Sequence, residues 1–371
     1  MNPASSEDKK PHVFHFSPTP GTLGGIWSYS GRIVESDLKE KYRFTRFSLD
    51  EHTHGIEPKI INFLTKKFRE SAIDIIQIHD LMLTSWHAVV AARRANVPRI
   101  LINCHAFSED LFLQPKIKKL IWREFVEPDI LKRADAVYNV SSFGAAKPVI
   151  HNSGIKNFGA INVALPVVPA SEPSAELKAS FGFAPDDIVA VTITRADHEK
   201  GWQLMADVAE RMVREGIDQP KMLFVGDGPH FQEFKERLAP LEKAGRVSLP
   251  GRRSDVPEIN AMSDFFVSPT FRDYQSSSFL EAMLQNKAVL TTRVGGNAEI
   301  VIDGVTGQLI PPGNSDALFD SMMWFTNHPD EIKAMGLAGR KRVEMYHSMP
   351  GLVASLDNVY QTMLREFPKP K

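Results

Sequence analysis

Two cations and two carboxylates in the second half of the chain could together bind a phosphorylated, hydroxyl-rich ligand. Arg195 and Lys200 lie in the stretch TRADHEKGW, and Asp273 precedes Glu281 by eight positions. Fixed cations stabilise the negative charge that develops when a bond to phosphate breaks, and ionised carboxylates accept hydrogen bonds from hydroxyl groups. The simpler alternatives are two surface cations on a loop and a glutamate that the helix dipole favours in a first turn.

The stretch from residue 263 to 301 alternates between strand, loop and helix. DFFVSP and AVLTTRV are short β-branched and aromatic runs, which are typical of buried parallel strands. Between them, SSSFLEAMLQNK opens with serines that can cap a helix, so we expect Ser276 and Ser277 at its start. Asp273 then lies on the loop after a strand, and Glu281 lies in the first turns of the helix. Both carboxylates then lie at the carboxyl end of the parallel strands, which is where open α/β folds bind ligands. A helix N-terminus at that place favours phosphate.

These motifs resemble the nucleotide-sugar site of retaining glycosyltransferases of family 4, the glycosyl transferases group 1, which have the GT-B fold. The family pattern is an acidic residue, seven residues, and then Glu-Ala followed by a small or apolar residue. Asp273 and the run 281–283 match it, and Gly295, Gly296 and Glu299 supply a downstream GG-x-x-E. The resemblance covers most of residues 180–345. It implies an α/β protein with two Rossmann-like domains.

The sequence departs from the family pattern in two ways. The first acid is usually Glu, so Asp273 is one methylene shorter, and the usual Phe-Gly is replaced by Gln275 and Ser276. Both changes bear on how a donor sugar is held. The motif therefore indicates the class of ligand and leaves the sugar open.

The resemblance also implies a role for each candidate residue. Arg195 and Lys200 would clamp the diphosphate, Glu281 would bind ribose hydroxyls, and Asp273 would bind hydroxyls of the donor sugar. The remaining implied contacts with the nucleotide sugar are those of Ser276 and Ser277 at the helix start, His105 beside the sugar, Gly24 and Gly25 beside the phosphates, Gly226 at a strand end, and Arg252 near the nucleobase. A tight turn at either glycine site, or a capping or buried histidine, is the alternative reading.

The first half of the chain repeats a strand–helix rhythm typical of a mostly parallel sheet. Two of its strands end in His79-Asp80 and in His105. Residues 166–175 (PVVPASEPSA) lack periodicity and indicate an interdomain linker. We therefore expect one domain over 1–165 and a second over 166–349. The resemblance implies that the first binds the acceptor, that the second binds the donor, and that a C-terminal helix at about 350–368 returns to the first domain.

Composition excludes several classes of function. A formal net charge of −1 removes global basicity as a means of binding nucleic acid. Cys104 is the sole cysteine, and no zinc-type Cys/His spacing is present, so we expect no disulfide and no metal cofactor. We also expect no signal peptide or membrane span and a cytoplasmic protein.

Residues 112–133 combine an apolar stripe with a basic flank, the pattern of an interfacial helix. Contact with the membrane surface at the cytoplasmic face is one interpretation, and a core-packing helix with a solvated basic face is the other.

The expected function is transfer of a sugar from a nucleotide-diphosphate sugar to a carbohydrate, lipid-linked or small-molecule acceptor, with retention at the anomeric carbon and without a metal. Glycan, glycolipid or polysaccharide biosynthesis is the expected setting. A GT-B nucleotide-sugar epimerase and a non-catalytic nucleotide-sugar binding protein are the alternatives. Product analysis separates all three, because fold alone does not decide function.

Overall fold

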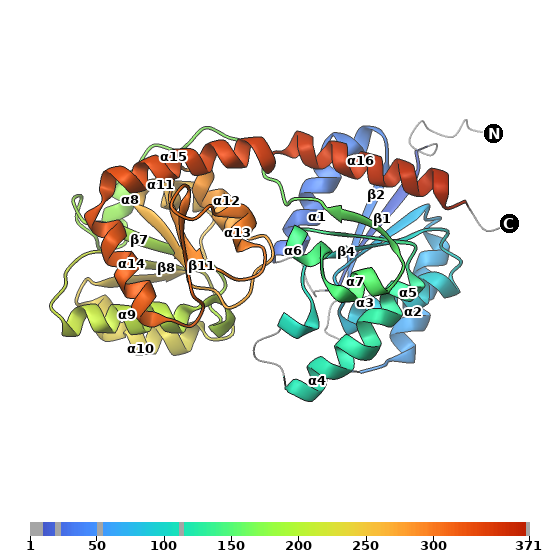
Figure 1. Cartoon of the computed structure of the whole chain (residues 1–371), viewed down its shortest axis with the longest axis horizontal. Helices are drawn as coiled ribbons and strands as arrows, with labels where there is room; N and C mark the ends of the chain where they lie inside the picture. Colours follow the sequence, from blue (N-terminus) through green and yellow to red (C-terminus); the bar gives the residue numbers. More distant parts are fainter. Residues whose placement is uncertain (1–9, 19–23, 50–54, 111–114, 369–371) are drawn as a thin grey trace. The chain divides into compact units, whose positions relative to one another are not determined.

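The computed structural model describes residues 10–18, 24–49, 55–110 and 115–368, which belong to two compact units (Figure 1). Unit 1 comprises Met1–Val163 and Met349–Lys371, and unit 2 comprises Ala164–Ser348. These limits lie within two residues of the expected domain limits. Most of the predicted glycine-rich turn before Gly24, and the start of the 112–133 segment, lie outside the described residues.

Unit 1 is built on a six-stranded parallel sheet in the order β2-β1-β3-β4-β5-β6. Its strands are β1 (His12–Ser17), β2 (Arg43–Ser48), β3 (Ile75–His79), β4 (Ile100–Cys104), β5 (Ala136–Asn139) and β6 (Lys156–Ala160). Its main helices are α1 (Gly25–Glu35), α2 (Pro58–Glu70), α3 (Leu83–Arg94), α4 (Lys116–Ile121), the π-helix η4 (Trp122–Val126), α5 (Glu127–Arg133) and α16 (Met349–Glu366). Short elements are η2 (Asp37–Glu40), η3 (Ser108–Asp110), α6 (Ser142–Ala145) and α7 (Pro148–Asn152).

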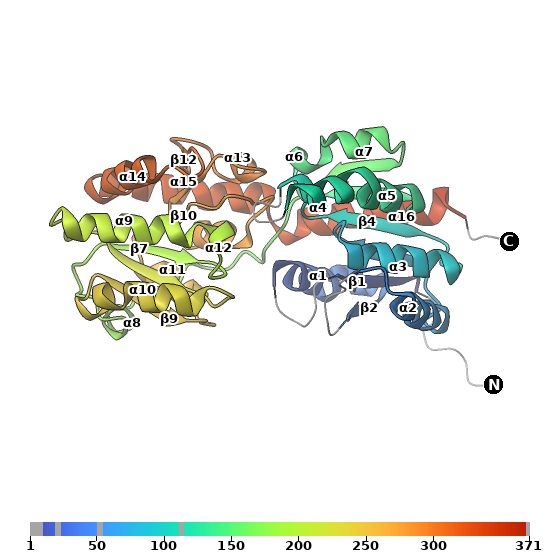
Figure 2. The ribbon, with the colours of Figure 1, turned by 90° about the horizontal axis from the view of Figure 1, so that it is seen from below.

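The helix α16 returns to the sheet of unit 1, although it is the last helix in sequence (Figures 1 and 2). It contacts β3, and the buried guanidinium of Arg99 donates hydrogen bonds to its carbonyl oxygens at Met363 and Leu364. Its buried residues include Leu352, Leu356 and Tyr360. Helix α16 therefore supplies part of the core of unit 1.

Unit 2 repeats the same plan, with the parallel strand order β12-β11-β10-β7-β8-β9. Its strands are β7 (Val189–Ile193), β8 (Lys221–Val225), β9 (Val247–Gly251), β10 (Phe265–Ser268), β11 (Val289–Thr292) and β12 (Gly307–Ile310). Its helices are α8 (Ala175–Ser180), η5 (His198–Lys200), α9 (Trp202–Arg214), α10 (Phe231–Lys243), α11 (Val256–Met262), α12 (Ser277–Leu284), α13 (Asn297–Ile300), α14 (Ser315–Asn327) and α15 (Pro329–Tyr346). The expected α/β class with two parallel sheets is confirmed.

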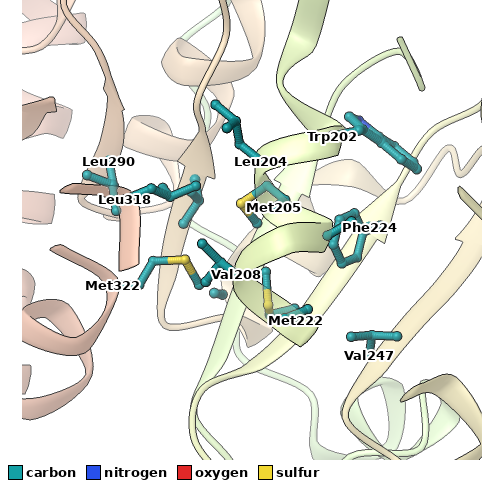
Figure 3. Packing of buried hydrophobic residues seen from close by; sticks show 14 of the residues in the cluster. Trp202, Leu204, Met205, Val208, Met222, Phe224, Val247, Leu290, Leu318 and Met322 are labelled. Carbon is teal, nitrogen blue, oxygen red and sulfur yellow. The ribbon is translucent and has the colours of Figure 1, made fainter. Parts of the chain in front are cut away.

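The core of unit 2 forms where α9 packs on its sheet (Figure 3). The 3.6-residue periodicity of KGWQLMADVAERMVREG places Trp202, Met205 and Val208 on the buried face of α9. Trp202 packs edge-on against Phe224, and its indole N–H donates to the hydroxyl of Thr194 at 2.9 Å. This packing fixes the start of α9, and with it the loop that precedes the helix.

The predicted linker 166–175 is instead attached to unit 2 up to the start of α8. The carbonyl oxygen of Val168 accepts a hydrogen bond from Arg340 at 2.7 Å, and the amide of Ser171 donates to the side-chain oxygen of Gln285 at 2.7 Å. This segment is neither helix nor strand, and its backbone makes separate hydrogen bonds to distant residues of unit 2. Its sequence therefore shows no helical or strand periodicity.

Candidate functional site

Lys200 and Asp273 form an ion pair at the carboxyl edge of the unit 2 sheet. The Nζ atom of Lys200 lies 2.7 Å from Oδ2 of Asp273, although the residues are 73 positions apart. Lys200 ends the helix η5, which follows β7, and Asp273 lies on the loop after β10. These strands are neighbours in the sheet, so their carboxyl ends emerge side by side.

Close backbone contacts hold the two loops together. The amide of Phe271 donates to the carbonyl of Glu199 at 2.8 Å. Gly201 has φ of 78°, and a Cβ atom there would lie 2.2 Å from the carbonyl oxygen of Pro269, so no other residue fits without movement. Lys200 is therefore placed by the fold and not by its own flexible side chain.

The carboxylate of Asp273 is fixed from both sides. Its Oδ1 accepts from the amide of Tyr274 at 2.9 Å while its Oδ2 faces Lys200. Its backbone carbonyl accepts from Gly296 at 3.2 Å, and a Cβ atom on Gly295 would lie 1.8 Å from that carbonyl oxygen. The glycines of the downstream motif thus permit the close approach of two loops.

The helix α12 begins directly after this loop. Ser276 is its N-cap residue, Ser277 is its first residue, and the partly exposed Glu281 lies in its second turn. The positive end of the helix dipole therefore faces the same edge as Lys200, which favours an anion there.

Arg195, Gly226 and Arg252 follow the neighbouring strands β7, β8 and β9. Arg195 is exposed and pairs with Asp197 at 2.9 Å. A Cβ atom on Gly226 would lie 1.9 Å from the carbonyl oxygen of Thr194, so this glycine lets two strand ends meet. Arg252 is exposed just after β9. The predicted residues of unit 2 thus lie on the loops at one edge of its sheet.

The predicted residues of unit 1 lie at the carboxyl end of β4 and the start of α1. Gly24 caps α1 with φ of 108°, a conformation that glycine adopts readily, and Gly25 is the first residue of the helix. His105 follows β4 and is partly exposed. Its Nε2 atom lies 3.2 Å from Nδ1 of His79.

A buried polar layer continues from His79 through unit 1. Nε2 of His79 lies 3.1 Å from Nδ1 of His15, and Nε2 of His15 lies 3.5 Å from the hydroxyl of Tyr360 on α16. That hydroxyl donates to Oε1 of Gln77 at 2.7 Å. The strand register explains the layer, because paired residues on adjacent strands point to the same face.

The ring of His79 joins His105 to the rest of this layer. Its Nδ1 lies 3.0 Å from Oδ1 of Asn103 and 3.2 Å from Nε2 of His105. Which ring nitrogen donates in each of these contacts depends on the tautomer of each imidazole.

Burial keeps the rings neutral. Loss of solvation is the main cause that lowers the pKa of His79 to about 4; the hydrogen bond to Asn103 opposes the shift, and the nearby charge of Arg46 adds to it. The pKa values of His15 and His105 are also held well below the ordinary range, first by desolvation and then by the neighbouring His79.

Sequence reasoning missed two groups of residues. Asn103, Gln77 and Tyr360 complete the polar layer, and the polar residues spaced two apart in QIH could have signalled it. His198, His230 and Glu233 lie together, with potential metal-ligand atoms all within 4.8 Å. No short spacing in the sequence signals this group, because two loops supply it.

The 112–133 segment contains a helix that is largely exposed. No residue of α4 or η4 is buried, and α5 is the part that packs, through Ile130 and Leu131. Four exposed apolar side chains lie on α4 and η4: Ile117, Leu120, Ile121 and Phe125. Within the described parts of the chain, no helix combines the length and the apolarity that crossing a membrane requires.

Comparisons with known proteins show a matching family model and several similar proteins. Residues 173–342 match the family model described as "Glycosyl transferases group 1". The chain is similar to an N-acetyl-alpha-D-glucosaminyl L-malate synthase of Bacillus anthracis (27% identity, 52% of this chain, 50% of that protein). It is also similar to a GDP-mannose-dependent phosphatidylinositol monomannoside mannosyltransferase of Mycolicibacterium smegmatis (24% identity, 72% of each). The match thus spans half of the Bacillus protein.

The fold is shared with solved structures. HepE of Anabaena in complex with UDP-glucose has a TM-score of 0.78 at 17% identity, covering 94% of this chain and 99% of that one. A sucrose-phosphate synthase of Thermosynechococcus elongatus has a TM-score of 0.77 at 18% identity, covering 96% and 100%. The expected GT-B fold is confirmed, as is the resemblance to glycosyl transferases group 1 over residues 173–342.

Proposed function

From the match of residues 173–342 to glycosyl transferases group 1, we propose that this chain transfers a sugar from a nucleotide-diphosphate sugar to an acceptor hydroxyl. Unit 2 would bind the donor and unit 1 the acceptor. The similar proteins are named as enzymes that glycosylate small molecules and glycolipids, which supports a role in glycan, glycolipid or polysaccharide biosynthesis.

The observation that carries the proposal is the pair Lys200–Asp273 beside the N-terminus of α12. A diphosphate needs cations and a helix N-terminus, whereas a sugar needs fixed acceptors for its hydroxyls. In the ion pair, the cation Lys200 and the hydrogen-bond acceptor Asp273 lie 2.7 Å apart. A donor lying with its phosphates toward Lys200 and its sugar toward Asp273 meets both needs, and Glu281 then receives the ribose hydroxyls.

The proposal includes retention of configuration. A double displacement needs a carboxylate nucleophile beneath the sugar ring. Asp273 is held by Lys200 and Tyr274, and Glu281 is assigned to the ribose, so neither suits that role. We therefore favour a same-face route, in which the departing diphosphate takes the proton of the acceptor hydroxyl as the bond to the sugar breaks. Arg195 and Lys200 stabilise the charge on the departing group.

His105 is proposed to act on the sugar side of the reaction. Its Nε2 lies 3.2 Å from Nδ1 of His79, which positions the ring. A hydrogen bond between this neutral imidazole and a sugar hydroxyl would hold the donor sugar in an oxocarbenium-like transition state without adding positive charge beside it. Gly24 and Gly25 would let the backbone at the start of α1 approach the donor phosphates.

We propose that the transfer needs no metal ion. The two cations Arg195 and Lys200 supply the charge that Mg²⁺ supplies in other transferases, and the sequence has no Asp-x-Asp pair of the kind that holds such an ion on a diphosphate. A cytoplasmic location is part of the same proposal.

The proposed second partner is an anionic membrane surface, bound through α4 and η4. Ile117, Ile121 and Phe125 are spaced four residues apart, so they lie along one side of the helix, and they are 64%, 48% and 70% exposed. Leu120 widens this side. Four basic residues accompany it, namely Lys116, Lys118, Lys119 and Arg123. Apolar burial in the interface and attraction to anionic lipid then act together.

A screen of nucleotide sugars tests the proposed function without knowledge of the acceptor. Binding of a nucleoside diphosphate, together with slow hydrolysis of one nucleotide sugar, supports it. A set of UDP- and GDP-linked sugars that neither bind nor react would overturn it.

A further inference from the structure

We propose that His198, His230 and Glu233 form a binding site for a divalent transition-metal ion of the zinc class. The three side chains come from two loops of unit 2. His198 opens the helix η5 after β7, His230 is the N-cap residue of α10 after β8, and Glu233 lies in the first turn of α10. The assignment rests on this geometry and is independent of the proposed sugar transfer.

The distances fit first-row metal coordination. Nε2 of His198 lies 3.5 Å from Oε2 of Glu233, and Nδ1 of His230 lies 3.2 Å from the same oxygen. Ligand atoms about 2.1 Å from a tetrahedral Zn²⁺ are separated by about 3.4 Å, so both distances lie close to the edge of such a tetrahedron. The potential ligand atoms of all three residues lie within 4.8 Å of one another.

The donor set selects the class of ion. Two imidazole nitrogens and one carboxylate oxygen suit Zn²⁺, Co²⁺, Ni²⁺ and Cu²⁺. Mg²⁺ and Ca²⁺ prefer oxygen ligands throughout, so the site discriminates against them. Three protein ligands leave a fourth position for water. All three side chains keep partial exposure, so an ion can reach them from solvent.

The site is already held in shape by the backbone. The amide of His230 donates to the carbonyl of Ala196 at 3.2 Å, and the amide of Ala196 donates to the carbonyl of Asp227 at 3.1 Å. The imidazole rings of His198 and His230 lie 4.1 Å apart, and Phe234 packs edge-on against His198. Little rearrangement is then needed to bind an ion.

A bound ion would fasten the loop that carries Lys200. His198 is two residues before Lys200 in η5, and the ion would join this short helix to the start of α10. Its role would be to stabilise the donor-binding edge of unit 2, with no part in the bond-breaking step, which remains assigned to Arg195 and Lys200. Within the described residues, this is the only group of three or more such side chains that close together.

Calorimetric titration of the full chain with Zn²⁺, and visible absorption with Co²⁺, test the assignment directly. We expect one equivalent to bind with the absorption of a tetrahedral Co²⁺ site. A Zn²⁺ concentration 100 times the dissociation constant should raise the melting midpoint by about 5–10 °C. Mg²⁺ at the same concentration should produce no such shift.

Matched variants complete the experiment. Glu233→Gln and His230→Ala should each weaken Zn²⁺ binding by at least about tenfold, because each removes one of three ligands. His151→Ala changes an exposed histidine of unit 1 and should leave the titration unchanged. Circular dichroism verifies that each variant is folded. Absence of saturable Zn²⁺ binding would overturn the proposal, and so would binding that persists in both site variants or a parent Co²⁺ spectrum of octahedral type.

Discussion

The Nζ atom of Lys200 lies 2.7 Å from Oδ2 of Asp273 across two neighbouring strand ends of unit 2. Because the proposed donor has its phosphate next to its sugar, a cation beside an acceptor for hydroxyls is the arrangement such a molecule requires. The pair therefore links the two halves of the proposed donor.

Removing the cation should weaken diphosphate binding selectively. Loss of a charged hydrogen bond costs roughly 1.5–3 kcal/mol, so Lys200→Ala should lower the affinity for UDP or GDP by about tenfold or more and nearly abolish transfer. Calorimetry measures the affinity. Lys235→Ala is the matched control, since Lys235 is paired with Glu242 on α10 away from these loops. Parent-like binding and turnover in Lys200→Ala would show that the site is assigned wrongly.

Replacing Glu281, the residue proposed to bind the ribose, should lower the affinities for all nucleotides by a similar factor. In Glu281→Ala, the affinities for UMP and UDP should fall by a similar factor of about ten, because both contain the ribose. In Lys200→Ala, the affinity for UDP should fall more than the affinity for UMP, because Lys200 is proposed to bind the diphosphate. A Glu281→Ala variant that discriminates between the two nucleotides would contradict the assignment of this residue to the ribose.

His105 should act on turnover more than on binding. Since its imidazole is proposed to hold the sugar in the transition state, His105→Ala should lower kcat strongly while changing nucleotide affinity by less than about threefold. His151→Ala provides a control for loss of a histidine from unit 1. Equal losses in kcat and in nucleotide affinity would indicate that His105 serves only to bind.

The buried histidines predict how stability depends on pH. The pKa of His79 is about 4 in the folded chain, and an unfolded histidine has its usual pKa near 6.5. The unfolded state therefore binds more protons below pH 6.5, so the stability of unit 1 should be fully present above that value and fall as the pH drops toward 4. The loss from His79 alone should reach about 3 kcal/mol.

Urea denaturation at pH 7.5, 6, 5 and 4 measures this loss. A His79→Gln variant, which lacks the titrating ring, should show a shallower dependence between pH 6.5 and 4. A parent protein with constant stability across this range would show that His79 is not kept neutral by burial.

Membrane binding should depend on one face of α4 and η4. Ile117→Ser should reduce sedimentation with vesicles that contain phosphatidylserine. Ile56→Ser should not, although Ile56 is equally exposed, at 68% against 64%. Vesicles of phosphatidylcholine alone should bind less of the parent, because the basic residues contribute about 1 kcal/mol each only at an anionic surface. Equal effects of the two variants would contradict the assigned face.

The sequence predicted the fold well, because buried parallel strands leave apolar runs and helix starts leave serine and glycine signals. The ordered motifs around Asp273 and Glu281 likewise located the edge of the sheet in unit 2. The segment 166–175 has the aperiodic pattern of a linker because its backbone hydrogen bonds to distant residues leave no periodic signal in the sequence.

Other features depend on contacts between strands and could not be read from spacing. The link from His105 through His79 and His15 to Tyr360 joins three strands and the last helix of the chain. The proximity of His198 to His230 requires two loops to be adjacent, which follows only from the strand order β10-β7-β8.

The proposed metal independence concerns an ion needed for transfer, such as Mg²⁺ or Mn²⁺, and not the ion proposed to bind at His198 and His230. Transfer should continue in EDTA, since Arg195 and Lys200 neutralise the departing diphosphate, even though the chelator also removes any ion from His198 and His230. An assay with and without EDTA, followed by added Mg²⁺ or Mn²⁺, measures this. A strict requirement for either added ion would contradict the proposed charge stabilisation.

The central claim is tested most directly by proton NMR of the chain with UDP-glucose and GDP-mannose, with and without a glycan acceptor, and with Lys200→Ala as the control. The account predicts that the anomeric signal of one donor decays, that nucleoside diphosphate accumulates, and that the first sugar product has the α configuration of the donor. A β-configured first product would contradict the retaining mechanism. An epimerised nucleotide sugar, or donors that stay unchanged in the presence of acceptor, would contradict sugar transfer itself.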